Sequence, residues 1–124
     1  MSAVIRPEDV PGLAGMDSEA PVFMVNLLKF KQPGGLDSYL QYGAGVAPIL
    51  EAVGATVRFA GATPSVVASE EGAPWWDVML VVEYPSPAAF LDMVTSDEYA
   101  LVAPHRDGAL ERGDLIATSN WNFT

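Results

Sequence analysis

The feature that most constrains the fold is the apolar stretch at residues 75–84, which turn-forming residues bound on both sides. Its β-branched and aromatic residues favour a β-strand. One face carries Val78, Leu80 and Val82, and the other carries Met79 and Val81. A strand with one face in water alternates apolar and polar residues, so a strand that is apolar on both faces needs a cover on each side. A chain of 124 residues supplies one helical layer, and we expect a second copy to cover the other face.

Length and composition agree with this expectation. A chain of 124 residues is typical of one domain. Half of its residues are hydrophobic and only 18% are charged, which favours oligomerisation. The net charge of −10 repels phosphate backbones and anionic membranes, and the six cations form no run. We therefore expect a homodimer that binds neither nucleic acid nor membranes.

The sequence also narrows the chemistry and the location. There is no cysteine and only one histidine, which excludes a zinc site, and the acidic residues lack calcium-loop spacing. We therefore expect no metal and no cofactor. No apolar run approaches the roughly 20 residues of a membrane span, and the first ten residues lack the apolar core of a secretion signal. The prediction is a cytoplasmic protein.

The order of the elements predicts the fold class. Residues 1–20 are expected to be an N-terminal extension and residues 21–124 a single domain. The predicted elements are a strand at 21–31, a helix at 37–53 that Pro48 kinks or divides, a strand at 55–60 that 64–69 extends, the strand at 75–84, a helix at 88–94, a helical piece from 97 that breaks near Pro104, and a strand at 115–121. This βαββαβ order is the split β-α-β arrangement of an α+β, ferredoxin-like domain, an antiparallel sheet with its helices on one face.

Short motifs in this order carry a family resemblance. They are Asn26-Leu27-Leu28-Lys29-Phe30, Tyr39 and Tyr42 before Val46-Ala47-Pro48-Ile49-Leu50, Trp76-Asp77, Glu83-Tyr84-Pro85-Ser86 with Ala89-Phe90, Ser96, Glu98-Tyr99 and His105-Arg106. Together they resemble the family catalogued as domain of unknown function 1330, within the dimeric α/β-barrel superfamily, over residues 21–119. The resemblance implies a ferredoxin-like subunit that dimerises through its sheet. Its superfamily relatives include cofactor-poor monooxygenases, lactone isomerases, dehydrochlorinase-like proteins and stress-response modules, and a shared fold does not choose among these activities.

Three charged or titratable residues are candidates for chemistry. His105 is the one side chain with an ordinary pKa near neutrality, so it is a candidate general base; the alternative is a helix cap or a carboxylate pair. Arg106 is a candidate clamp for a substrate carboxylate, or a surface ion pair. Asp77 follows Trp76 at the start of the apolar strand, where desolvation would favour proton transfer; the alternative is a structural acceptor.

Four further residues are candidates for substrate binding. Asn26 is the one polar residue in the middle of the first predicted strand, and we expect its amide to point away from the helices, toward a ligand cavity beside Asp77. The alternative is a structural amide that satisfies a neighbouring backbone group. Tyr39 and Tyr42 share a helical face and either pack in the core or offer hydroxyls at a pocket. Trp76 either stacks on a ligand ring or packs at an interface.

Two classes of function fit these residues. In the first, the protein is a metal-independent enzyme of the lyase, isomerase or monooxygenase type that acts on a small organic acid or aromatic metabolite. In the second, it is a non-catalytic dimeric binding or stress-response module. The enzyme class requires His105, Arg106 and either Asn26 or Asp77 to converge on one cavity, whereas the module class allows them to be dispersed.

Overall fold

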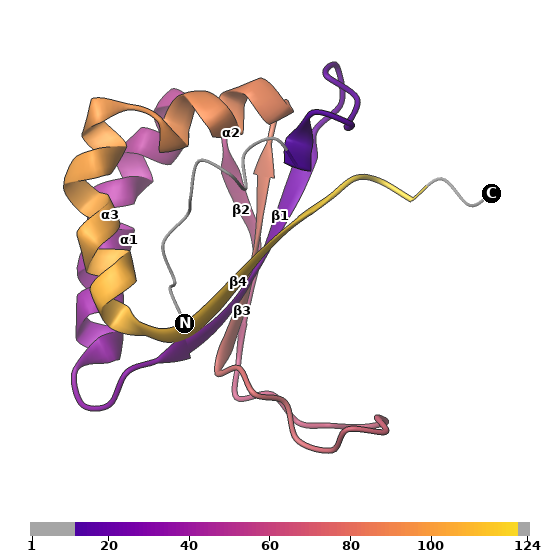
Figure 1. Cartoon of the computed structure of the whole chain (residues 1–124), viewed down its shortest axis with the longest axis vertical. Helices are drawn as coiled ribbons and strands as arrows, with labels where there is room; N and C mark the ends of the chain where they lie inside the picture. The colour runs from indigo at the N-terminus through magenta and orange to yellow at the C-terminus, as the bar shows by residue number, and fades with distance from the viewer. Residues whose placement is uncertain (1–11, 122–124) are drawn as a thin grey trace.

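A computed structural model describes residues 12–121. These residues form the elements β1 (Val22–Phe30), α1 (Gly35–Ala52), β2 (Thr56–Ala62), β3 (Val78–Tyr84), α2 (Pro87–Val94), α3 (Asp97–Ala109) and β4 (Leu110–Thr118). The strands build one antiparallel sheet in the order β2-β3-β1-β4. All three helices lie on one side of this sheet (Figure 1). The predicted α+β class with a four-stranded antiparallel sheet is confirmed.

Both interior prolines lie inside continuous helices, so the predictions that Pro48 divides its helix and that the last helical piece breaks near Pro104 are wrong. Pro48 lies within α1 and Pro104 within α3. Each proline is exposed, and so is the residue four positions before it, whose carbonyl loses its helical N–H partner. Because that carbonyl faces water, it can be hydrated, and packing of the opposite helical face holds the helix together.

Serine side chains cap the starts of α2 and α3, whereas no side chain of residues 12–121 caps the start of α1. Ser86 caps α2 by accepting a hydrogen bond from the backbone N–H of Ala89 at 3.2 Å, and Ser96 caps α3 in the same way. The chain enters α1 at Gly34, whose φ of 87° is in the left-handed region that glycine adopts without strain. Asp37 lies in the first turn of this helix, where a negative charge is favourable.

The side of β1 that lies under the helices is the opposite of the one predicted. Val22, Met24 and Leu28 are buried in the helix-facing core, whereas Phe23, Val25 and Leu27 are only partly buried. The register agrees, because Met24 pairs with Val82 and Leu28 with Val78, and cross-strand partners point to the same side of a sheet. Because both faces of β1 are apolar, hydrophobic alternation does not indicate which face lies under the helices.

The other side of the sheet is not covered within the chain, and we call it the open sheet face. Alternation and cross-strand pairing place seven apolar side chains there: Phe23, Val25, Leu27, Phe59, Met79, Val81 and Ile116. Five charged side chains share this face: Lys29, Arg58, Glu83, Arg112 and Asp114. Arg58 is ion-paired with Glu83 at 2.7 Å and Arg112 with Asp114 at 3.2 Å.

Strand β2 lies at one edge of the sheet and contains a bulge. Val57 pairs with Val82 and Phe59 with Val81, so Arg58 is an extra residue that has no partner in the ladder. After β2 the chain forms a long loop at residues 63–77, which we call the β2–β3 loop. This loop turns away from the helices, on the side of the open sheet face (Figure 1). The predicted extension of the strand over residues 64–69 is part of this loop, so that prediction is wrong.

Candidate functional site

A cluster of tyrosine side chains around a buried arginine lies between the helices and the sheet. We call it the tyrosine–arginine cluster, and it consists of Tyr39 and Tyr42 from α1, Tyr84 from β3, and Tyr99 and Arg106 from α3. Tyr99 and Arg106 are seven residues apart, which is two helical turns, so both project from α3 on the same side. Arg106 is only 4% exposed. The cluster therefore places a positive charge inside the protein among phenol groups.

Ring contacts link three of the four tyrosines, Tyr39, Tyr42 and Tyr99, into an aromatic wall. Tyr39 and Tyr42 have ring centroids 5.4 Å apart, and the rings of Tyr42 and Tyr99 meet edge-on at 6.2 Å. The hydroxyls of Tyr42 and Tyr99 share a hydrogen bond of 3.1 Å. Tyr84 packs edge-on against Phe90 and its hydroxyl lies 3.8 Å from the sulfur of Met93. These contacts fix the rings, as a binding wall requires.

Burial keeps the hydroxyls of Tyr39, Tyr42 and Tyr84 protonated at neutral pH. Burial raises the pKa of Tyr39, and the nearby Arg106 guanidinium acts in the opposite direction. Burial also raises the pKa of Tyr42 and of Tyr84, and the proximity of Tyr99 adds to both shifts. A protonated phenol donates a hydrogen bond, and a guanidinium offers only donors. The cluster therefore presents donors and positive charge, which is the chemistry that suits an anionic oxygen.

Asn26 lies on the helix-facing side of β1, so the prediction that its amide points away from the helices is wrong. It is 8% exposed and pairs in register with Leu80 and Leu115. Its amide nitrogen donates a long hydrogen bond of 3.4 Å to the carbonyl of Met24 in its own strand. Asn26 is thus a buried amide in the same layer as the tyrosine–arginine cluster.

The other predicted site residues lie apart from this cluster. His105 is exposed on α3, and its backbone carbonyl accepts a hydrogen bond from the Ser38 hydroxyl at 3.0 Å. The carboxylate of Asp77 accepts a hydrogen bond from the backbone N–H of Phe30 at 3.1 Å, which makes it an acceptor at the end of the sheet. The structure thus brings Arg106, Tyr39 and Tyr42 together and leaves His105 and Asp77 outside.

Two members of the cluster escaped the sequence analysis. Tyr99 could have been found from its seven-residue spacing to Arg106, which places both on one face of a helix. Tyr84 shares the helix-facing side of β3 with Val82, so alternation along the strand carried the signal. Both tyrosines were part of the family resemblance and were not considered as binding residues.

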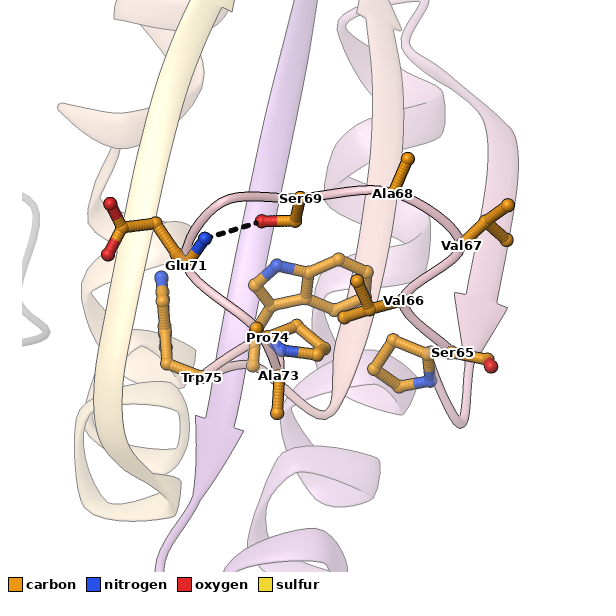
Figure 2. Close-up of a pocket in the computed structure, with 12 residues that line it drawn as sticks. Ser65, Val66, Val67, Ala68, Ser69, Glu71, Ala73, Pro74 and Trp75 are labelled. Carbon is orange, nitrogen blue, oxygen red and sulfur yellow. Dashed lines mark hydrogen bonds between the residues drawn. The ribbon is translucent and has the colours of Figure 1, made fainter.

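Trp76 lies in the β2–β3 loop, which frames a shallow open hollow of about 770 Å³ (Figure 2). Residues 64–69 and 71–76 line this hollow, so it is made almost wholly of the loop itself. Trp75 lies beside β4, where the Arg112 guanidinium stacks on its ring at 3.7 Å from the centroid. The hollow and the tyrosine–arginine cluster share no residue.

Within residues 12–121, no three His, Asp or Glu side chains lie close enough together to hold a metal ion. Within the same range, no helix combines the length and the apolar character that crossing a bilayer requires.

Comparison with known proteins places this geometry in a family. Similar solved structures include RPA0582, a protein of unknown function from Rhodopseudomonas palustris, with 27% identity, a TM-score of 0.81 and 95% of each chain covered. A dimeric protein of unknown function with a ferredoxin-like fold from Bacteroides fragilis has 11% identity and a TM-score of 0.55, and 81% of this chain and 96% of that chain are covered.

Another similar structure is that of the hydroxynitrile lyase from Passiflora edulis, with 16% identity, a TM-score of 0.64, and coverage of 86% of this chain and 99% of that chain. At this identity the likeness shows the shared fold alone. No curated protein matches the chain. The model of the family described as domain of unknown function (DUF1330) matches residues 21–120, and the chain therefore belongs to the DUF1330 family.

Proposed function

We propose that the protein binds a small organic acid, and that the guanidinium of Arg106 and the hydroxyls of the tyrosine–arginine cluster hold the carboxylate. The observation that carries this proposal is the placement of Arg106, which is 4% exposed and lies among buried phenols. A guanidinium fits a carboxylate with two parallel hydrogen bonds, and burial strengthens such a charge-assisted contact.

The same cluster favours an acid with an aromatic or apolar body. The rings of Tyr39, Tyr42 and Tyr99 form a connected wall, and aromatic walls with a few convergent polar groups are typical of small-ligand sites. The buried amide of Asn26, on the sheet side of this layer, supplies a further donor and acceptor. We propose that it contacts a polar group of the ligand away from the carboxylate.

Binding without turnover fits the geometry better than a metal-independent lyase, isomerase or monooxygenase. Such an enzyme needs a group beside the substrate that moves a proton near neutral pH. His105 is exposed, and Asp77 is engaged with the backbone of Phe30. The cluster tyrosines whose pKa is raised by burial are poor bases at neutral pH. The likeness to a hydroxynitrile lyase does not supply the missing group.

We also propose that the protein acts as a homodimer that buries the open sheet face. This face carries seven apolar side chains, and two of them, Phe59 and Ile116, are strongly exposed in the single chain. A contiguous apolar surface of this kind typically marks a protein interface. Two proteins of similar fold are described as dimeric, which supports a homodimer.

Calorimetric titration with a panel of aromatic and aliphatic carboxylates, each paired with its neutral amide, tests the binding proposal. We expect some acids to bind and their amides to bind at least about tenfold more weakly, because a neutral amide cannot form the charge-assisted pair. Arg106→Gln should abolish the preference for the acid. Lys31→Gln, which removes an exposed cation outside both the tyrosine–arginine cluster and the open sheet face, is the control and should leave it unchanged.

Because Arg106 is buried, its replacement can also disturb folding. Tyr99→Phe removes one hydroxyl and keeps the ring, so a folded Tyr99→Phe protein should bind the acid more weakly without losing its aromatic contacts. The proposal is wrong if no acid in the panel binds better than its amide, or if folded Arg106→Gln protein keeps the preference. Turnover of a bound acid would favour the enzyme class instead.

A further inference from the structure

The β2–β3 loop is unusually long for a connection between neighbouring antiparallel strands. Loops of this length without secondary structure are uncommon in small domains and usually have a function. The loop begins at Thr63, whose φ of 53° in the left-handed region redirects the chain as it leaves β2. It then projects beyond the sheet on the side of the open sheet face (Figure 1). A loop that only joined β2 to β3 would not need to extend in this direction.

Several contacts hold the base of the loop in this projecting geometry. The backbone N–H of Asp77 donates to the carbonyl of Leu28 at 2.8 Å, and the carboxylate of Asp77 accepts from the backbone N–H of Phe30 at 3.1 Å. The ring of Trp75 lies under the guanidinium of Arg112. The end of the loop is therefore tied to both β1 and β4.

The far part of the loop exposes apolar side chains to water. Val67 is 97% exposed and Val66 is 42% exposed. Figure 2 shows Val66 turned toward the hollow of the loop and Val67 turned away from it. The loop continues into two exposed acids, Glu70 and Glu71. Its surface is thus an aliphatic tip followed by negative charge.

The open sheet face has the complementary character. Its apolar centre is accompanied by three cations, Lys29, Arg58 and Arg112, and by two acids, although the whole chain has a net charge of −10. Arg58 and Arg112 are ion-paired with Glu83 and Asp114, so Lys29 leaves this face with one net positive charge on a protein whose net charge is −10. An acidic segment is therefore repelled less here than by the rest of the surface.

We infer that the β2–β3 loop of one protomer packs against the open sheet face of a second copy, with Val67 as its apolar contact and Glu70 and Glu71 near the cations of that face. This inference rests on the proposed homodimer and adds a reciprocal contact to it. In a two-fold dimer each loop reaches the partner, so the contact occurs twice and any substitution is doubled.

Sedimentation equilibrium of Val67→Asp tests the contact. Since Val67 is exposed in the single chain, the substitution should leave folding intact, while a carboxylate buried against an apolar face should raise the dimer dissociation constant by about tenfold or more. Leu101→Asp, at a similarly exposed aliphatic position on α3, is the matched control and should not change it. A monomeric wild-type protein overturns the homodimer and the loop contact together. A dimer that Val67→Asp leaves equally tight overturns the loop contact alone.

Cross-linking gives an independent readout, because the chain contains no native cysteine. V67C labelled with a thiol-reactive photocrosslinker, in an equal mixture of light and heavy isotope chains, should give mixed-isotope cross-links from residue 67 to peptides of β1, β3 or β4. L101C is the control and should give none to these strands. Cross-links from V67C that join only peptides of one isotope would place the loop against its own chain and overturn the inference.

Discussion

The alkaline stability of the protein should be set by its buried phenols. Burial raises the pKa of Tyr39, Tyr42 and Tyr84 above the ordinary value of 10.0, at which tyrosines of the unfolded chain titrate. Above that pH, the unfolded chain releases three protons that the folded chain keeps. Stability from these groups is therefore fully present below about pH 10 and is lost as the pH rises further. Each proton contributes about 1.36 kcal/mol per pH unit, so the free energy of unfolding should fall by up to about 4 kcal/mol per pH unit.

Urea unfolding followed by circular dichroism, at a series of pH values from about pH 8 upward, measures this slope. Ultraviolet absorbance of the phenolate in the same samples counts ionised tyrosines. We expect Tyr39, Tyr42 and Tyr84 to ionise only when the circular dichroism signal is lost. Ordinary exposed phenols would ionise near pH 10 while the protein is still folded, and that result would refute the reasoning.

Tyr84→Phe provides an internal check on the magnitude. The hydroxyl of Tyr84 has only a weak contact with the sulfur of Met93, so its removal should change stability little at neutral pH. It should reduce the alkaline slope by about 1.4 kcal/mol per pH unit, because one of the three protons no longer contributes. An unchanged slope would show that Tyr84 does not control the alkaline limb.

Three further substitutions test how the fold is held together. Ser96→Ala removes the cap that accepts the backbone N–H of Tyr99 and should lower the free energy of unfolding by about 1 kcal/mol in urea titrations; a change near zero would contradict this role. Asp77→Ala leaves the backbone N–H of Phe30 without its acceptor and should cost about 1–3 kcal/mol by the same measurement, whereas an unchanged midpoint would mean that water replaces the carboxylate. Tyr42→Phe and Tyr99→Phe should be coupled by about 0.5–1.5 kcal/mol in a double-mutant cycle, and additive effects would argue against their shared hydrogen bond.

The two central strands were predictable because residues 75–84 and 21–31 are rich in apolar and β-branched residues and are bounded by turn formers. The same two-sided apolar character made the facing of Asn26 unpredictable, because either register buries an apolar face. Alternation along β3 placed Val78, Leu80 and Val82 on one face, and that face lies under the helices. The observed pairing of Asn26 with Leu80 shows that Asn26 lies on the same side of the sheet, and the sequence alone did not reveal this pairing.

The sequence indicated an arginine and tyrosines as site residues, but it did not indicate which residues lie together. Arg106 was expected to hold a carboxylate beside His105. Consecutive residues in a helix point about 100° apart, so the two side chains do not share a direction. The structure buries Arg106 and exposes His105. Pro104 was expected to end the helix before these residues. The helix continues because Pro104 faces water, and its continuation is what places Tyr99 and Arg106 on one side. Sequence reasoning treated the proline as a break and therefore missed the helical spacing.

The bulge at Arg58 has a consequence for how copies of this chain can meet. An edge strand with a regular ladder can add further strands from other molecules without limit, which leads to fibres. In β2 the extra residue interrupts the ladder, and Arg58 is tied to Glu83 of the neighbouring strand at 2.7 Å. A chain with so apolar a sheet can thus associate face to face, which ends at two copies, while growth along this edge is blocked. Deleting Arg58 would restore the regular edge and should convert a finite assembly into an open-ended one.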